Sequence, residues 1–156
     1  MKKQNYLKLW VSLVNTRDAI SKLRERELKK FHVSAAQSGV LSVLYYAKEN
    51  LTPAEISRRS FRDPSSVTVI LNRMVTKGLI KKLKDKKRKN LKRIALTAKG
   101  RDLYTRIIEE MCIYGLFSTL SGEQCQQLGE CLNVLLSGAA GRLNGPSEIA
   151  GKTTDL

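Results

Sequence analysis

Two closely spaced helix-start signals constrain the fold of this chain more than any other feature. Residues 52–55 read Thr-Pro-Ala-Glu, in which Thr caps a helix, Pro suits its first position and Glu binds back to the capping residue. Asp63 and the proline after it repeat this logic, and apolar residues then recur at helical spacing until Gly78 supplies a left-handed stop. The pattern predicts helices over 52–60 and 64–77 with a short connection, which is a helix-turn-helix.

The next stretch of sequence predicts a β-hairpin. Segments 79–84 and 91–96 are compatible with β-strands and flank the polar segment 85–90. A helix-turn-helix followed directly by such a hairpin is a winged helix. The expected hairpin tip is strongly basic, and its cations are Lys86, Lys87, Arg88 and Lys89.

Helices are also expected on both sides of this unit. Residues 5–31 place apolar side chains at roughly helical spacing without Pro or Gly. A capping box at 34–37 opens a helix that should end near 48–50, and Thr97 is expected to cap a helix that extends to about Phe117.

A further capping box at 121–124 opens a final helix with an apolar stripe. Segment 144–156 contains almost no large apolar residue, and we expect a frayed tail there. The expected fold is mainly α with a small β-hairpin wing: a winged helix-turn-helix with long N- and C-terminal helices.

Positive charge is concentrated in the predicted winged helix. The chain has 29 Lys and Arg against 14 Asp and Glu, a net charge of +15, and residues 52–101 hold sixteen of the basic residues and three of the acidic ones. These cations are spread over several short elements rather than along one helical face, so nucleic acid is a better partner than a membrane surface. The sequence contains neither a signal-peptide core nor a membrane helix, and we expect a soluble, cytoplasmic protein.

Residues suited to catalysis or metal binding are scarce. We expect no enzyme activity, cofactor or metal, because the sequence lacks a glycine-rich phosphate loop, a second histidine and carboxylates paired for acid–base chemistry. The single histidine, His32, is assigned a structural role. The cysteines fit a reducing compartment and are expected to pack rather than to sense oxidants, which is the alternative; they are Cys112, Cys125 and Cys131.

Taken together, the motifs resemble the MarR family of bacterial transcription regulators. In order, they are Val-Ser-Ala-Ala-Gln at 33–37, Leu-Thr-Pro-Ala-Glu-Ile at 51–56, Asp-Pro-Ser-Ser-Val-Thr at 63–68, Asn-Arg-Met at 72–74, Lys-Gly-Leu-Ile at 77–80 and Leu-Thr-Ala-Lys-Gly at 96–100. The resemblance covers about residues 5–138 and implies a homodimer whose terminal helices intertwine while two winged-helix lobes straddle operator DNA. The implied domains are an N-terminal dimerisation helix at 1–33, the winged helix at 34–100, C-terminal dimerisation helices at 101–143 and the tail at 144–156.

The resemblance implies DNA contacts by the second helix of the helix-turn-helix and by the wing. Helical hydroxyls and amides complement base edges in the major groove, whereas basic hairpin side chains reach phosphates or a narrow minor groove. The recognition-helix residues are Ser65, Ser66, Thr68, Val69, Asn72 and Arg73, and the wing residues are Lys86, Lys87, Arg88 and Lys89.

Two positions depart from the family pattern. Many members carry an Arg after the Thr of the recognition helix, where this chain has Val69. Many also have an Asp-x-Arg in the wing; depending on the register, Arg88 or Lys89 stands near its Asp and Asn90 near its Arg.

Three assignments stay open. Arg73 either binds a phosphate or pairs with Asp63. Aromatic residues either line a pocket for a small aromatic effector or belong to the core, and these are Tyr6, Trp10, Tyr45 and Tyr46. For the whole protein we expect a sequence-specific regulator, in the first instance a repressor, on an inverted-repeat operator in double-stranded DNA. The alternative is a non-specific architectural nucleic-acid binder, for which a basic wing would suffice.

Overall fold

The computed structural model describes residues 3–85, 88 and 90–144. The chain divides into two compact units, Met1–Met111 and Cys112–Leu156. The first unit contains α1 (Lys3–Leu28), a short 3-10 helix η1 (Lys29–Phe31), α2 (Ala35–Tyr45), α3 (Pro53–Ser60), α4 (Pro64–Thr76), β1 (Ile80–Lys84), β2 (Lys92–Leu96) and α5 (Ala98–Glu109). The second unit contains α6 (Ile113–Phe117) and α7 (Gly122–Asn144).

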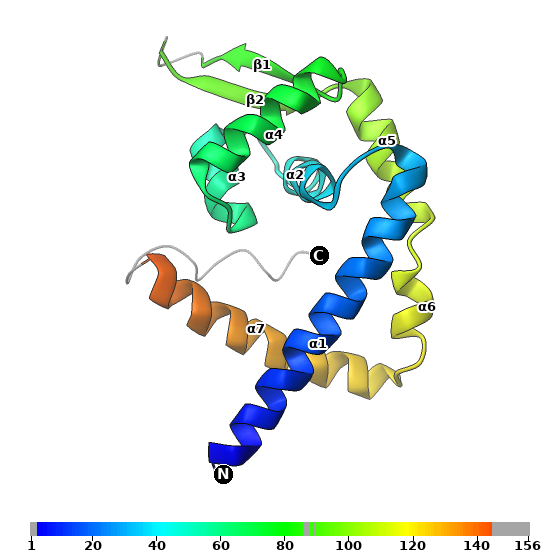
Figure 1. Cartoon of the computed structure of the whole chain (residues 1–156). Coiled ribbons are helices and arrows are strands. Elements are labelled where there is room, and N and C mark those ends of the chain that lie inside the picture. Colours follow the sequence, from blue (N-terminus) through cyan, green and yellow to red (C-terminus); the bar gives the residue numbers. More distant parts are fainter. Residues whose placement is uncertain (1–2, 86–87, 89, 145–156) are drawn as a thin grey trace. The chain divides into compact units, whose positions relative to one another are not determined.

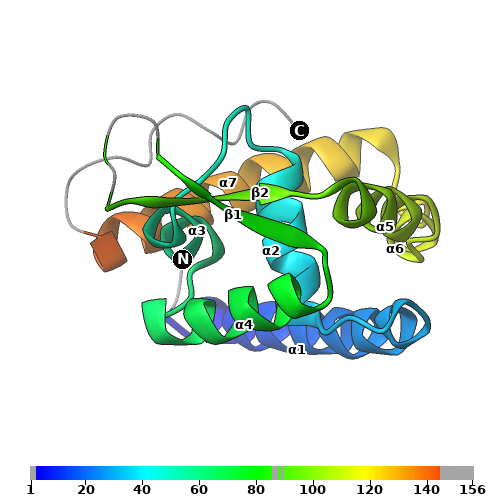
Figure 2. The same ribbon diagram turned by 90° about the horizontal axis from the view of Figure 1, so that it is seen from above.

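The first unit confirms the predicted winged helix. Helix α2 lies at the centre of a lobe and packs against α1, α3, α4 and α5, with the hairpin beside α4 (Figures 1 and 2). We call residues 33–109 the winged-helix lobe. Every element of the lobe contributes fully or almost fully buried apolar side chains to one core, which includes Val40, Leu41, Leu51, Ile56, Val67, Met74, Ile94 and Ile107.

The hairpin has the expected antiparallel pairing, with one additional segment. Its register joins Ile80 to Leu96 at one end and Lys84 to Lys92 at the other. Leu51, in the connection before α3, forms an isolated β-bridge with Ile94. The Leu51 amide donates to the Ile94 carbonyl oxygen at 3.3 Å, and the Ile94 amide donates to the Leu51 carbonyl oxygen at 2.7 Å. This bridge fastens β2 to the start of the helix-turn-helix.

The predicted capping boxes are confirmed at three helix starts. Before α2, the Gln37 amide donates to Ser34 Oγ and the Ser34 amide donates back to Gln37 Oε1. Thr52 and Glu55 make the same exchange before α3, and a third box, formed by Ser121 and Gln124, precedes α7.

The capping role expected of Asp63 is wrong. Asp63 occupies the N-cap position of α4, but its side chain makes no capping hydrogen bond. The first turn of α4 is exposed, so water can satisfy its amides, and Pro64 at the first helical position has no amide to satisfy.

Two predicted helix ends also need correction. Helix α2 ends at Tyr45, before the expected 48–50. The helix expected to run on to about Phe117 stops at Glu109, because Glu110 leaves helical geometry at φ −99° and ψ 15° and the Met111 amide bonds to Ile108 in a tighter turn. Helix α6 then begins separately at Ile113.

The joint between the wing and α5 depends on the predicted Thr97 cap and on Gly100. Thr97 Oγ1 accepts from the Gly100 amide at 3.0 Å and donates to the Gly78 carbonyl oxygen at 2.7 Å. A Cβ on Gly100 would overlap the carbonyl oxygen of Leu79, so only glycine allows this close approach. Gly78 itself has a φ of 69°, which confirms the expected left-handed stop after α4.

Large apolar side chains remain exposed outside the lobe. The N-terminal half of α1 extends away from the lobe (Figure 1) and exposes Tyr6, Leu7, Leu9, Trp10 and Leu13. In the second unit, α7 exposes Leu128, Leu132, Val134, Leu135 and Leu136. None of the helices described is both long and apolar enough to cross a membrane. The tail predicted at 144–156 lies almost entirely outside the described residues.

Candidate nucleic-acid interface

Helix α4 has one buried face and one exposed face. Val67, Leu71 and Met74 are buried and anchor the helix in the core of the lobe. The six residues predicted to contact DNA all lie on the exposed surface: Ser65, Ser66, Thr68, Val69, Asn72 and Arg73. All six predicted residues are therefore exposed on one helix, and the buried face of that helix anchors it to the core of the lobe.

A tight turn sets the direction in which α4 leaves α3. Phe61 adopts a left-handed conformation with a φ of 50°, and its amide bonds back to the end of α3. The hydroxyl of Ser57 donates to the Arg62 carbonyl oxygen at 2.5 Å, while the Arg62 amide donates to the Ser57 carbonyl oxygen at 3.1 Å. Sequence reasoning did not identify this buried serine, whose role becomes visible only once the turn closes.

An internal ion pair holds the base of the wing. Arg93 Nε bonds to Asp85, and Arg93 Nη1 donates to the Asn50 carbonyl oxygen at 2.7 Å. The hydrogen bond with Asp85 is the largest cause of a raised pKa of Arg93. The second oxygen of Asp85 accepts from the Arg88 amide at 2.8 Å, which ties the hairpin tip to its base. Arg93 is therefore a structural clamp between the wing and the segment before α3.

The structure describes one of the four predicted wing residues. Arg88 is exposed at the hairpin tip, next to the clamp. The other three, Lys86, Lys87 and Lys89, lie outside the described residues. Asp85 is the single acid in this run of cations, and that isolation was a usable sequence signal for a structural pair.

The lobe surface around α3, α4 and the hairpin is strongly basic. Its exposed cations include Arg58, Arg59, Arg62, Arg73, Lys77, Lys81, Lys82, Lys84, Arg88 and Lys92. Two acids in the same region, Glu55 and Asp85, are engaged in a helix cap and in the wing clamp, respectively. Such an excess of exposed cations attracts a polyanion at long range.

A hollow of about 430 Å³ borders the far end of α4. Its lining includes Arg73 and Lys77 from α4 and its C-cap, and Ser34 and Gln37 from the start of α2. Lys77 Nζ donates to the His32 carbonyl oxygen at 2.6 Å, so this cation holds the turn before α2 in place.

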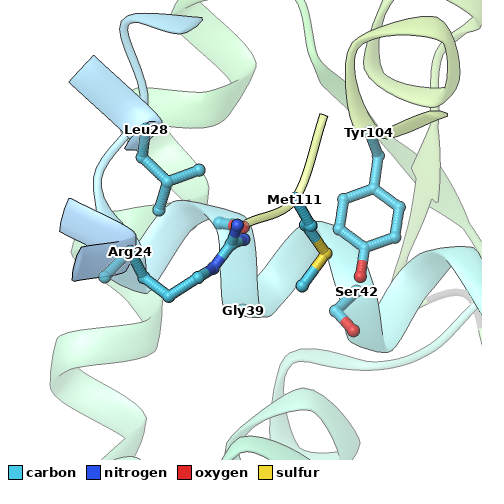
Figure 3. Close-up of a pocket in the computed structure, with 8 residues that line it drawn as sticks. Arg24, Leu28, Gly39, Ser42, Tyr104 and Met111 are labelled. Carbon is cyan, nitrogen blue, oxygen red and sulfur yellow. The ribbon is translucent and has the colours of Figure 1, made fainter. Parts of the chain in front are cut away.

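A second cavity, of about 270 Å³, lies between α1, α2 and α5. Figure 3 shows Arg24 and Leu28 of α1 on one side and Tyr104 of α5 on the other, with the Tyr104 hydroxyl directed toward Ser42. Burial raises the pKa of Tyr104, and its hydrogen bond with Ser42 offsets part of that rise.

The four aromatic residues predicted for an effector pocket do not line this cavity. Tyr6 and Trp10 are 57% and 63% exposed on α1, because the extended half of that helix has no packing partner within the lobe. The rings of Tyr45 and Tyr46 instead pack against Tyr104 in tilted and edge-on arrangements, at ring-centroid distances of 5.0 and 6.3 Å. Sequence reasoning missed Tyr104 and Arg24, which the folding of α5 and α1 against α2 brings together.

A sequence profile described as the MarR family matches residues 33–89. Comparison with curated protein sequences found no match. Among solved structures, the ligand-free organohalide-sensing transcriptional regulator RdhR-CbdbA1625 is 25% identical over 100% of this chain and 93% of its own, with a TM-score of 0.82.

Two further structures are similar. The same regulator in its 2,4-dichlorophenol-bound form is 26% identical over 93% of this chain and 86% of its own, with a TM-score of 0.78. The S. aureus MepR–DNA complex is 27% identical over 88% of this chain and 99% of its own, with a TM-score of 0.69. The similarity therefore extends well beyond the segment that the profile matches.

Proposed function

Because residues 33–89 belong to the MarR family and the chain has the winged-helix fold of MarR-family regulators, we propose that this protein is a sequence-specific transcription regulator. In this proposal, a homodimer binds an inverted repeat in double-stranded DNA and represses transcription. The protein acts by binding rather than by catalysis.

The observation that carries this proposal is the pairing of two features on one lobe. The exposed face of α4 offers hydroxyl, amide and apolar groups, which suit base edges in the major groove. The adjacent hairpin and the helix ends around it supply exposed cations, which suit phosphates. One of the similar structures, that of MepR, is a DNA complex.

Exposed apolar side chains on two terminal helices support a homodimer. Leu9 and Trp10 of α1 are about 60% exposed, and Val134 and Leu135 of α7 are 73% and 57% exposed. Apolar surface of this extent is typical of an interface, and a two-fold dimer would cover the same surfaces in both chains. A two-fold protein matches a two-fold operator, which is why an inverted repeat is proposed.

Binding selectivity distinguishes the proposed regulator from the alternative, a non-specific architectural nucleic-acid binder. Duplexes that bind the full-length protein would be selected from a random pool, and affinities would be measured for the selected and random duplexes over a salt series. A regulator should prefer the selected inverted repeat by about a thousandfold or more at physiological salt. Equal affinities for both duplexes would contradict sequence-specific binding and favour an architectural role.

We also propose that a small aromatic compound regulates DNA binding from the cavity between α1, α2 and α5. The cavity combines apolar walls with a guanidinium from Arg24 and a hydroxyl from Tyr104, which suits a phenolic ligand. A similar regulator was solved with 2,4-dichlorophenol.

An effector releases DNA only if it binds better to the shape that cannot bind DNA. The test measures operator affinity with and without 2,4-dichlorophenol, for the wild type and for Tyr104→Phe. A phenol that binds the protein without changing operator affinity would contradict this regulation.

A further inference from the structure

Two polar side chains of α4 have already used part of their hydrogen-bonding capacity. The Thr68 hydroxyl donates its one hydrogen to the Pro64 carbonyl oxygen at 2.9 Å, which leaves oxygen lone pairs and a methyl group for a ligand. Asn72 Oδ1 accepts a hydrogen bond from Lys82 Nζ of β1 at 2.7 Å. Because an ammonium group only donates, this contact directs the carboxamide oxygen toward Lys82 and the amide N–H groups away from it.

The orientation of Asn72 restricts how it can read a base. Bidentate recognition of adenine requires both the oxygen and the nitrogen of a carboxamide to face the base. With its oxygen directed toward Lys82, Asn72 carries its N–H donors on the side away from Lys82, which suits a phosphate or a single base acceptor. Base selectivity beyond that single donor then depends on other residues of α4.

Val69 occupies the middle of the exposed face. Helical neighbours lie three and four positions apart, so Val69 is surrounded by Ser65, Ser66, Asn72 and Arg73. Its side chain is 49% exposed, forms no hydrogen bonds and, being β-branched, is held in one preferred rotamer in a helix. A rigid apolar group thus stands at the centre of a polar surface.

We propose that Val69 is a specificity-determining residue that contacts the C5-methyl group of a thymine in each operator half-site. Thymine is the one base that presents an apolar group in the major groove. Placing the Val69 side chain against the acceptors of guanine or the donor of cytosine would instead strip water from them without replacing its hydrogen bonds.

This inference rests on the proposed DNA-binding function and is tested after an operator has been selected. Each thymine of the selected duplex is replaced in turn by deoxyuridine, which removes the methyl group and leaves the hydrogen-bonding edges unchanged. Affinity is then measured for the wild type, for Val69→Ala and for Val75→Ala. Val75 is 38% exposed near the C-terminal end of the same helix and provides a matched control.

We expect one thymine per half-site at which deoxyuridine weakens wild-type binding about fourfold, the effect of losing one buried methyl group. Val69→Ala should bind the unmodified operator more weakly and lose its response to deoxyuridine at that position. Val75→Ala should respond as the wild type does.

The inference is overturned if no thymine shows this effect in the wild type, or if Val69→Ala responds as strongly as the wild type does. Both results leave selective DNA binding intact and so are distinct from failure of the proposed function. A random pool from which no sequence is enriched would contradict the proposed function and, with it, this inference.

Discussion

The winged-helix lobe and the terminal helices differ in how far their apolar side chains are buried. In the lobe, Leu41, Ile56 and Ile94 are fully buried, and each helix start has a cap or a proline. Along α1 and α7, by contrast, residues such as Trp10 and Val134 remain more than 60% exposed. The core of the lobe is buried within one chain, whereas apolar side chains of the terminal helices are exposed and would be covered by the proposed dimer.

This difference separates two kinds of sensitivity to mutation. A substitution in the core of the lobe should lower the free energy of unfolding of each subunit, because this close-packed core forms within one chain. A change on the exposed stripe of α7 should leave the lobe folded and should affect association.

Gly100→Ala should destabilise the lobe by about 3 kcal/mol, because the added Cβ would overlap the Leu79 carbonyl oxygen at the joint between wing and α5. Urea-induced unfolding followed by circular dichroism measures this change. Gly39→Ala is the matched control, since a Cβ there meets no described atom within 4 Å, and it should stabilise α2 by roughly 0.5–1 kcal/mol. Equal stabilities for the two variants would contradict the close approach at Gly100.

Replacing Leu132 and Leu135 of α7 by Glu should weaken dimerisation about a hundredfold or more, because carboxylates would have to be buried in an apolar interface. Sedimentation equilibrium over a concentration series measures the dissociation constant. Gln126→Glu is the control, since this residue lies on the opposite side of α7 from the leucine stripe. A double variant that dimerises like the wild type would contradict the assignment of this stripe to the interface.

Much of the fold follows from local signals in the sequence. The start of α3 at Pro53 and the stop at Gly78 were predictable because a cap, a proline or a glycine acts within a few residues. The ends of α2 and α5 were not, since apolar residues continue past Tyr45 and Glu109 and no proline or glycine follows either end directly. Helix ends without a local signal depend on the packing of the whole lobe.

The candidate site also combines features that local sequence predicts with features that depend on tertiary contacts. The exposed positions of α4 followed from helical periodicity once Val67 and Leu71 were assigned to the core. The Arg93–Asp85 clamp and the Lys82–Asn72 contact join residues on different elements, so their pairing needs the hairpin register. The aromatic residues predicted for an effector pocket do not line the cavity between α1, α2 and α5, because aromatic composition does not show which helical faces meet.

Within the lobe, the wing and the recognition helix should respond differently to salt. Arg88→Gln should reduce the slope of log affinity against log salt by about 0.9 on both operator and random duplexes, through one lost phosphate contact. The same change is expected for Lys86, Lys87 and Lys89. Ser66→Ala should keep the slope and weaken operator binding about tenfold, because it removes a base-edge or positioning hydrogen bond. An unchanged slope for all four wing variants would show that the wing does not contact DNA.

The smallest expected effect comes from the charge of Glu55, which closes the capping box before α3, whereas the neutral Gln37 closes the box before α2. Burial alone would raise the pKa of Glu55, but hydrogen bonds from the Thr52 amide and hydroxyl, with the nearby Arg93 and Arg59, lower it below its ordinary value of 4.5. A carboxyl with a lowered pKa stabilises the fold above its ordinary pKa, and this contribution disappears as the pH falls through the lowered value.

Glu55→Gln keeps the geometry that Gln37 already uses, so the wild type should be more stable than this variant by roughly 0.5 kcal/mol at pH 7 and not at pH 3. Urea unfolding of both proteins across this range measures the difference, in which the titration of all other groups cancels. A constant difference would show that the charge of Glu55 does not stabilise α3.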